Sequence, residues 1–276
     1  MGSVSRLAIT VLSDNFSSTI IPPLLGEWGF SAYIETEKVK VLYDVGNSGI
    51  PVLRNAEKLG IDLSKVDYVV LSHGHLDHTG GLANEELREK IRGKVVVAHP
   101  SIFERKFLNW RNKLEYIGIP LSKEEMEREF RLLLTREPLE IAEGVYFSGE
   151  VKNYNFPRYT KGLFKASDER LAPDELKDDA ALYVNIAGKG VVAITGCGHS
   201  GVLNIAKHAI EVTKADKVHA IVGGLHLLAS TREEVEGVMA SLNVEKIAPA
   251  HCSGNLAKVL AGERYLDAGV GATLRF

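Results

Sequence analysis

The stretch Leu71-Ser-His-Gly-His-Leu-Asp-His-Thr-Gly-Gly-Leu82 carries four side chains that bind metals well: His73, His75, Asp77 and His78. It follows an apolar run of strand type, 66–71, so these side chains are expected on a tight turn at a strand end. A metal ion needs imidazole and carboxylate ligands that converge at about 2.0–2.2 Å. The first two histidines can converge on one ion, while the aspartate and the last histidine turn toward a second. The pattern therefore predicts a two-metal site.

Two further glycine-bounded segments can supply the ligands that a single turn cannot. They read Thr195-Gly-Cys-Gly-His-Ser-Gly201 and Pro249-Ala-His-Cys-Ser-Gly254, and each follows a predicted strand. We expect His199 and His251 to complete the metal shells. Cys197 keeps two interpretations, either a metal ligand or a small buried side chain of apolar character.

Other side chains at strand ends are candidates for supporting roles. His226, in Gly223-Gly-Leu-His-Leu227, is either a substrate contact or proton shuttle, or a structural residue. Asp44 is expected to orient a metal-bound imidazole, as carboxylates commonly do. Asp178 and Asp179 precede a predicted strand, where they serve the metal or its surroundings, or form a solvated turn.

The loop 196–201 leads into a predicted helix, 202–212. Free N–H groups and the positive end of the helix dipole make such a loop attractive to phosphate. Gly198, Ser200 and Gly201 are therefore predicted to contact an anionic substrate beside the metals.

Short β-branched runs alternate with segments of helical periodicity, which predicts an α/β fold with helices on the outer faces of its sheets. The predicted strands are 7–12, 30–34, 39–43, 66–71, 95–97, 181–186, 191–195, 218–222 and 247–249. The predicted helices are 50–59, 202–212, 233–242 and 255–260.

The middle of the chain differs from this alternation. Segment 101–136 is rich in charge and is predicted to be a helical insertion in a single domain, 1–276. It is either a solvated helical pair or a cap whose apolar face shapes a pocket. That face would consist of Phe103, Phe107, Trp110 and Leu114. Segment 152–179 has weak periodicity, and irregular stretches of this length are usually functional or mobile.

Composition places the chain among ordinary globular proteins, with 45% hydrophobic and 25% charged residues. The formal net charge of −3 favours neither nucleic acid nor an anionic membrane as a partner. The N-terminus does not resemble a signal peptide and no run of 18 apolar residues occurs, so a cytoplasmic location is expected. Two cysteines are too few for a disulfide framework.

The motifs resemble those of the metallo-β-lactamase superfamily over nearly the whole chain. The resemblance rests on VDYVVLS followed by HGHLDH, on the preceding LYDVG turn, and on the later histidines. The strings EWGFSAYIE, TGCGHSG, GGLHL and PAHCSG are similar to a narrower branch of this superfamily. That branch comprises 7,8-dihydropterin-6-methyl-4-(β-D-ribofuranosyl)aminobenzene 5′-phosphate synthase and its relatives.

The resemblance implies a four-layer αββα sandwich with two divalent metal ions at one edge of its sheets. Two departures from the superfamily pattern concern the ligands. Cys197 stands where most hydrolases of the superfamily have a bridging aspartate, and Asp178 and Asp179 occupy the stretch where a histidine-rich loop is usual. His199 is expected to take the role of the missing histidine. Zinc is the first expectation for the metal, with manganese as the alternative.

The expected function is that of a metal-dependent hydrolase or transferase acting on a small molecule that bears phosphate or pyrophosphate, as the synthase does. Asp77 would hold one metal and its water, and His226 would handle a leaving-group proton. Two alternatives stay open, a phosphodiesterase or nuclease and a non-catalytic metal-binding scaffold. Neither nucleic acid nor a membrane is expected as a partner.

Overall fold

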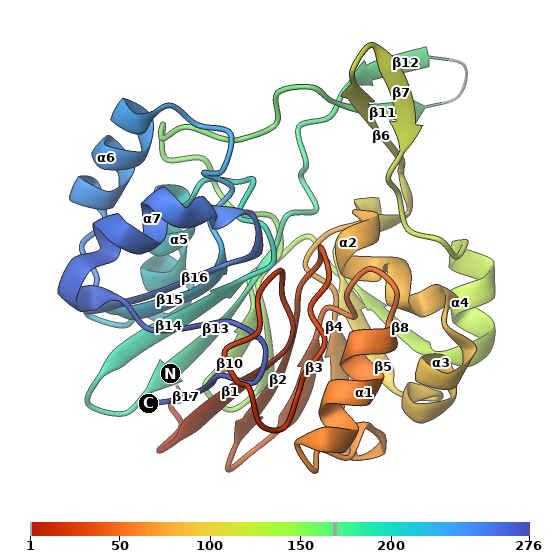
Figure 1. Cartoon of the computed structure of the whole chain (residues 1–276), viewed down its shortest axis with the longest axis horizontal. Helices are drawn as coiled ribbons and strands as arrows, with labels where there is room; N and C mark the ends of the chain where they lie inside the picture. Colours follow the sequence, from red (N-terminus) through yellow and green to blue (C-terminus); the bar gives the residue numbers. More distant parts are fainter. Residues whose placement is uncertain (1, 168–169) are drawn as a thin grey trace.

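Two β-sheets face each other and helices cover their outer sides in the computed structural model, which describes residues 2–167 and 170–276 (Figure 1). Within the described residues, the first sheet has the order β17-β1-β2-β3-β4-β5-β8. Its strands are β1 (Leu7–Ser13), β2 (Ser31–Thr36), β3 (Lys40–Tyr43), β4 (Tyr68–Val70), β5 (Val95–Ala98), β8 (Arg131–Leu134) and β17 (Thr273–Arg275). The β3, β4, β5 and β8 strands run parallel.

The second sheet has the order β16-β15-β14-β13-β10-β9. Its strands are β9 (Leu139–Ala142), β10 (Val145–Phe147), β13 (Ala181–Ile186), β14 (Gly190–Thr195), β15 (Val218–Gly224) and β16 (Lys246–Ala250). The last three strands are parallel neighbours joined by helical crossovers, which explains their nearly continuous apolar sequences.

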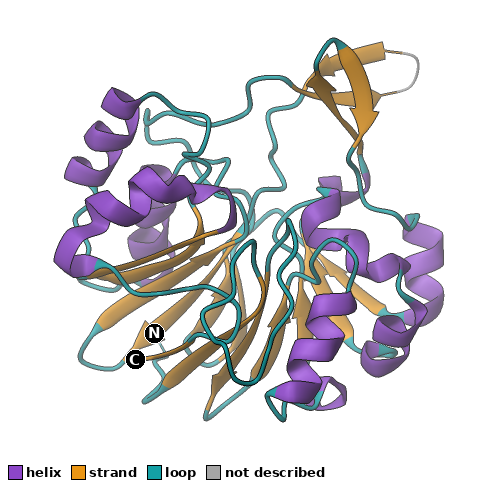
Figure 2. Ribbon diagram, in the orientation of Figure 1, coloured by secondary structure: helices purple, strands orange, loops and turns teal. Residues whose placement is uncertain are grey.

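Helices pack outside both sheets (Figure 2). The α-helices are α1 (Ile50–Lys58), α2 (Leu76–Thr79), α3 (Glu85–Ile91), α4 (Lys123–Glu129), α5 (Val202–Thr213), α6 (Arg232–Ser241) and α7 (Gly254–Ala261). Short 3-10 turns are η1 (Leu63–Lys65), η2 (Gly80–Ala83), η3 (Pro100–Phe103), η4 (His251–Ser253) and η5 (Gly262–Arg264). Capping boxes at Ser122–Glu125 and Thr231–Glu234 satisfy the free N–H groups that start α4 and α6.

Three apolar clusters account for the layering. The central cluster joins residues of both sheets, such as Ile9 and Leu182. A second cluster packs helix residues such as Val52 against the outer face of the first sheet. The third cluster packs α5, α6 and α7 against the second sheet, with Ile205 as an example. The predicted four-layer αββα architecture is therefore confirmed.

The prediction of a helical insertion at 101–136 is wrong for most of that segment. Strands β6 (Arg105–Trp110) and β7 (Lys113–Tyr116) form a hairpin, and only α4 is a regular helix there. Arg111 and Asn112 at the turn both have positive φ, 50° and 62°. Two such residues make the type of tight turn whose twist matches a two-stranded ribbon, so a hairpin forms in place of a helical pair.

Segment 152–179 also contributes strands that its weak periodicity did not predict. The β11 (Leu163–Ser167) and β12 (Arg170–Pro173) strands pair beside β6, giving a small sheet of order β12-β11-β6-β7. We call this sheet the arm. It stands above α2 and away from the two large sheets (Figure 1). The pairing of β6 with β11 joins segments more than 50 residues apart, which local periodicity does not reveal.

No helix among the described residues is both long and apolar enough to cross a membrane.

Candidate metal centre

The candidate site lies where the carboxyl ends of five parallel strands meet. Asp44 follows β3, His73 follows β4, Cys197 follows β14, His226 follows β15 and His251 follows β16. Open parallel sheets bind ligands at the carboxyl ends of their strands, because side chains of successive crossover loops gather there. Both large sheets contribute, so the site joins the two halves of the sandwich.

The first group of metal-binding atoms comes from His73, His75 and His199. His73 Nε2 lies 3.0 Å from His75 Nδ1, and the ring of His199 is about 5 Å from both, with centroid separations of 5.1 and 5.0 Å. Two nitrogens on one tetrahedral ion with bonds of 2.0–2.1 Å would be about 3.3 Å apart. The His199 Nε2 atom is buried and has no hydrogen-bond partner among the described residues. This donor set therefore fits a divalent ion.

The second group comprises Asp77, His78, Cys197 and His251, whose ligand atoms lie within 4.8 Å of one another. His78 Nε2 is 3.2 Å from Cys197 Sγ, and His251 Nε2 is 3.2 Å from Asp77 Oδ2. Two imidazoles, a carboxylate and a thiol are the ligand types that zinc takes. The second group therefore fits a divalent ion as well.

Cys197 belongs to both groups, since its Sγ also lies within 4.8 Å of ligand atoms of His73 and His199. A further set of the same compactness joins Cys197 to His226 and Cys252. The thiol is buried, and burial raises its pKa well above the usual cysteine range. Its position between the two groups, more than its burial, makes Cys197 a candidate ligand.

Four of the candidate ligand histidines have one ring nitrogen in contact with a polar group of the protein. This contact directs the other ring nitrogen toward the site. His78 Nδ1 donates to Asp44 Oδ2 at 2.7 Å, and both side chains are fully buried. His199 Nδ1 donates to the Tyr159 carbonyl oxygen at 2.8 Å. Such partners determine which nitrogen is free to bind a metal.

The same pattern holds at the other two rings. Ser72 Oγ donates to Asp44 Oδ2 at 2.7 Å, which leaves the Ser72 oxygen to accept from His73 Nδ1 at 2.9 Å. His251 Nδ1 lies 3.2 Å from Asn15 Oδ1, to which it can donate. Asp44 thus orients His78 directly and His73 through Ser72.

Burial and neighbouring charges shift the pKa values of the histidines in opposite directions. Burial lowers the pKa of His73 and His199 well below the usual range and that of His75 to about 3, so these rings are neutral near pH 7. Burial also opposes the charging of His78, but the carboxylates of Asp77 and Asp44 outweigh it and raise its pKa to about 9. A metal ion at His78 Nε2 would therefore displace a proton.

Asp77 behaves in the opposite sense. Burial alone would raise its pKa, but the adjacent histidines, His78 first, outweigh burial and hold that pKa below its usual value. The carboxylate stays ionised near pH 7 and is available as a ligand.

Three residues of the site have backbone conformations that residues other than glycine rarely adopt. The φ angles of Asp44, His226 and His251 are 53°, 51° and 49°. Such left-handed residues cost free energy and concentrate at functional sites. Gly74 meets a different demand, because a Cβ there would collide with the carbonyl oxygen of Ile102.

The remaining aspartates lie beside the two ligand groups without entering them. Asp178 accepts hydrogen bonds from the Gly74 amide at 2.8 Å and from Lys106 Nζ at 2.8 Å. Asp179 accepts from the Ser200 amide at 2.7 Å, and burial raises its pKa. The solvated-turn interpretation of this pair is wrong, since both are about 1% exposed.

The predicted phosphate contacts of Gly198, Ser200 and Gly201 find no support in this geometry. The Ser200 amide donates to Asp179, and the Gly201 amide donates to the Gly198 carbonyl oxygen at 2.9 Å. All three residues are buried and none lines the cavity described below. An anion at this loop would have to compete with bonds already formed inside the protein.

Several contributors were missed by sequence reasoning. Lys106 is fully buried between Asp174 and Asp178, at 2.9 and 2.8 Å, and ties the arm to the HxHxDH turn. Trp28 donates from Nε1 to Asp77 Oδ2 at 3.1 Å. The one available signal was that Trp28 belongs to the EWGFSAYIE string; nothing in the sequence places Lys106 beside residues about 70 positions away.

A cavity of about 570 Å³ opens over both ligand groups. Its lining includes the site residues His75, His199, His226 and His251, and the arm residues Leu108, Trp110 and Leu163. Trp110 of the expected apolar face lines this cavity, whereas Phe103, Phe107 and Leu114 do not.

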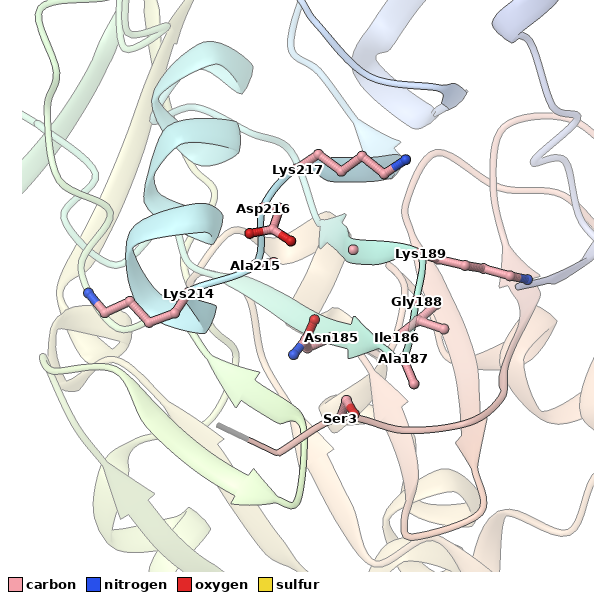
Figure 3. A pocket seen from close by; sticks show the side chains of 11 residues that line it. Ser3, Asn185, Ile186, Ala187, Gly188, Lys189, Lys214, Ala215, Asp216 and Lys217 are labelled. Atoms are coloured by element: carbon pink, nitrogen blue, oxygen red, sulfur yellow. The ribbon is translucent and has the colours of Figure 1, made fainter.

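A separate hollow of about 290 Å³ lies between the turns at 185–190 and 214–217 (Figure 3). Its described lining carries three lysines and one aspartate but no histidine or cysteine, and Lys217 there pairs with Glu245. It therefore offers none of the chemistry of the metal centre.

The chain is similar to several known proteins. The sequence profile of the metallo-β-lactamase superfamily matches residues 29–153. The chain is 30% identical over 283 residues to the 7,8-dihydropterin-6-methyl-4-(β-D-ribofuranosyl)-aminobenzene-5′-phosphate synthase of Methanocaldococcus jannaschii, covering 97% of this chain and 94% of that one. It is 32% identical over 250 residues to an uncharacterised protein of the same organism, with coverages of 89% and 90%. Among solved structures, a metal-dependent hydrolase of the β-lactamase superfamily is 29% identical with a TM-score of 0.81, covering 97% of this chain and 98% of its own.

Proposed function

The chain belongs to the metallo-β-lactamase superfamily, and from that premise we propose that it is an enzyme that uses two divalent metal ions on a small phosphorylated substrate. Zinc is the proposed metal, because the donors are mostly imidazole with one thiol, and manganese is the alternative. The substrate is proposed to carry a phosphate or diphosphate group.

One observation supports the two-metal proposal above all others. Two sets of ligand atoms meet at Cys197, one with His73 and His199, and the other with Asp77, His78 and His251. The Nε2 atoms of His75 and His199 are buried without a hydrogen-bond partner among the described residues. Leaving such atoms unpaired costs free energy, which a bound cation would offset.

The chain's own residues have distinct proposed tasks. Asp77 would hold one metal and its water, since its carboxylate is ionised near pH 7. His226 lines the cavity and lies 4.0 Å from His199 between ring centroids, which suits it to pass a proton to the leaving group. Bound divalent ions would supply Lewis-acid activation of water and of a phosphoryl oxygen.

Two reaction types fit this arrangement. In the transferase version, suggested by the synthase relative, an aromatic amine attacks a pterin methylene carbon and diphosphate leaves. In the hydrolase version, suggested by the metal-dependent hydrolase relative, water attacks a phosphoester. Both place an anionic group of the substrate at the same two ligand groups.

Metal analysis followed by a substrate screen tests the proposal. We expect about two zinc or manganese ions per chain, and metal-dependent turnover either of phosphoesters or of a pterin diphosphate with an aryl-amine ribose phosphate. The products decide between hydrolase and transferase. A chain that binds no metal after reconstitution contradicts the proposal, and metal binding without any turnover favours a scaffold. Cleavage of RNA would favour a nuclease.

A pair of histidine variants sharpens this experiment. His75→Ala should lose turnover and bound metal, because His75 Nδ1 lies 3.0 Å from His73 Nε2 in the first group. His219→Ala is the matched control, since His219 lies on β15 beside Glu245, 2.9 Å away, and outside both groups. Equal metal content in the two variants would remove His75 from the site.

A further inference from the structure

The chain contains two tryptophans, and both line the cavity above the metal centre. Trp28 is 51% exposed and Trp110 is 58% exposed. Single exposed apolar side chains are common and need no explanation, but large ones that converge on one cavity indicate a binding site. An aromatic ring can recover the free energy of its exposed surface when a ligand covers it.

Strand register places Trp110 on the cavity side of the arm. Leu108 and Trp110 are two positions apart on β6, so their side chains leave the same face of the sheet. Leu108 pairs directly with Leu163 of β11, and both residues line the cavity. The arm therefore turns an apolar face, ending in an indole, toward the metal centre.

Trp28 is fixed beside the metal centre by polar and aromatic contacts. Its Nε1 donates to Asp77 Oδ2, and its ring lies 5.1 Å from that of His251, with the two planes at 59°. The free face of this indole is therefore held in place before any ligand arrives. Preorganised aromatic surfaces of this kind bind with little loss of conformational entropy.

The rest of the cavity lining is mainly apolar. Apolar side chains dominate it: Leu76, Leu108, Ile117, Leu163 and Leu228. Among its described residues, Lys161 is the one cationic side chain outside the histidine cluster. A cavity of this composition suits a ligand with a large apolar part and an anionic end.

We propose that Trp28 and Trp110 form a subsite for a planar aromatic or heteroaromatic ring, so that the substrate is an aromatic phosphate or diphosphate rather than an aliphatic one. The anionic part of this inference rests on the proposed function. The ring subsite itself does not, because it depends on the two indoles alone. The arm thereby acts as the specificity element of the site.

Equilibrium binding to the zinc-loaded full chain tests the subsite. Phenyl phosphate and propyl phosphate carry the same charge and differ in the ring, and both can be followed by tryptophan fluorescence and by calorimetry. We expect phenyl phosphate to bind about three- to tenfold more tightly, as aromatic contacts usually contribute. Trp110→Ser should remove this preference. Equal binding of the two probes to the unaltered chain, or a preference that survives Trp110→Ser, overturns the inference.

Leu114→Ser is the matched control. Leu114 is 48% exposed on the same hairpin, but it pairs with Asn109 and does not line the cavity. It should keep the preference for phenyl phosphate.

A neutral ring separates this inference from the proposed function. We expect 6-hydroxymethylpterin to quench tryptophan fluorescence with and without zinc, and Trp110→Ser to weaken its binding. If neither phosphate binds while the pterin does, the phosphate part of the proposed function fails and the ring subsite stands. If both phosphates bind alike and the pterin does not, the subsite fails and the proposed function stands.

Discussion

The direction and the protonation of the side chains at this site depend on their buried hydrogen-bond partners. Asp44 accepts from the Ser72 amide at 2.7 Å, from Ser72 Oγ and from His78 Nδ1. With all of these partners buried, the carboxylate fixes both the tautomer and the direction of the His78 ring. The HxHxDH turn is therefore arranged for metal by a residue about 30 positions earlier in the chain.

Asp44→Asn should weaken metal binding without removing any proposed ligand. An amide cannot replace the charge that favours the His78 Nδ1–H form, so we expect metal affinity to fall by about 10- to 100-fold. Competition with a coloured chelator measures this change. Asp62→Asn, which alters an exposed carboxylate at the start of η1, is the control. Unchanged affinity in Asp44→Asn would mean that the His78 ring needs no such support.

Secondary-structure elements are joined near the site by buried polar groups. Lys106 of β6 extends between Asp174 and Asp178, and Asp178 continues to the Gly74 amide. The position of the arm and that of the metal-binding turn are thus set by one connected set of charges. A buried set of this kind stabilises only when every member keeps its partners.

Lys106→Met should destabilise the protein by about 3–5 kcal/mol, because it leaves two buried carboxylates without their cation. Urea unfolding of the metal-free chain measures the free energy of unfolding. Lys113→Met, an exposed lysine on β7 of the same hairpin, should change it little. A loss below about 1 kcal/mol in Lys106→Met would indicate that the carboxylates bind protons or water instead.

Helix α5 contributes a pH dependence that is separate from the metals. His208 is a buried residue of this helix, with Nδ1 3.2 Å from Tyr183 Oη, and burial lowers its pKa to about 4. The unfolded chain, with a histidine pKa of about 6.5, takes up this proton first as the pH falls. The contribution of neutral His208 is therefore complete above about pH 6.5 and is lost toward pH 4, by at most about 3 kcal/mol.

His208→Gln should flatten the fall in stability of the metal-free chain between pH 7 and pH 4.5. Urea unfolding at several pH values, with chelator present, provides the comparison. Lys207→Gln, an exposed neighbour on α5, should keep the original slope. The same slope in both variants would assign the pH dependence to other groups.

At the scale of the whole molecule, the candidate metal centre joins two sheets that also share the central apolar cluster. His73, His75 and His78 follow strands of the first sheet, while Cys197, His199 and His251 follow strands of the second. Figure 1 shows these strand ends meeting along the middle of the molecule. A bound ion would therefore hold together elements that are far apart in the sequence.

Zinc should raise the melting temperature, because it binds the folded arrangement and not the separated sheets. At a free concentration of about 100 times Kd, one ion adds about 2.7 kcal/mol. Scanning calorimetry with zinc or with chelator measures the shift. His251→Ala should lose most of it, whereas His219→Ala should retain it. A melting temperature that zinc does not change would mean that the folded chain does not bind zinc in preference to the unfolded chain.

The sequence by itself determined the layered α/β fold and the segments from which the candidate ligands come. Strands such as β4 and β14 were predictable because their β-branched runs are buried on both faces. The HxHxDH turn was recognisable as a metal-binding segment because its candidate ligands lie within six consecutive positions. These are local signals, and local signals survive in the sequence because they depend on neighbours along the chain.

Only the tertiary structure decided which partners those segments meet. The arm replaced an expected helical insertion because β6 and β11 pair across more than 50 residues. The Ser200 amide, expected to face a phosphate, was already taken by Asp179. Lys106 and Trp28 entered the site through contacts at long sequence separation. Pairing, burial and charge compensation between distant segments leave no periodic trace in a single sequence, which is the physical reason that these features required the folded molecule.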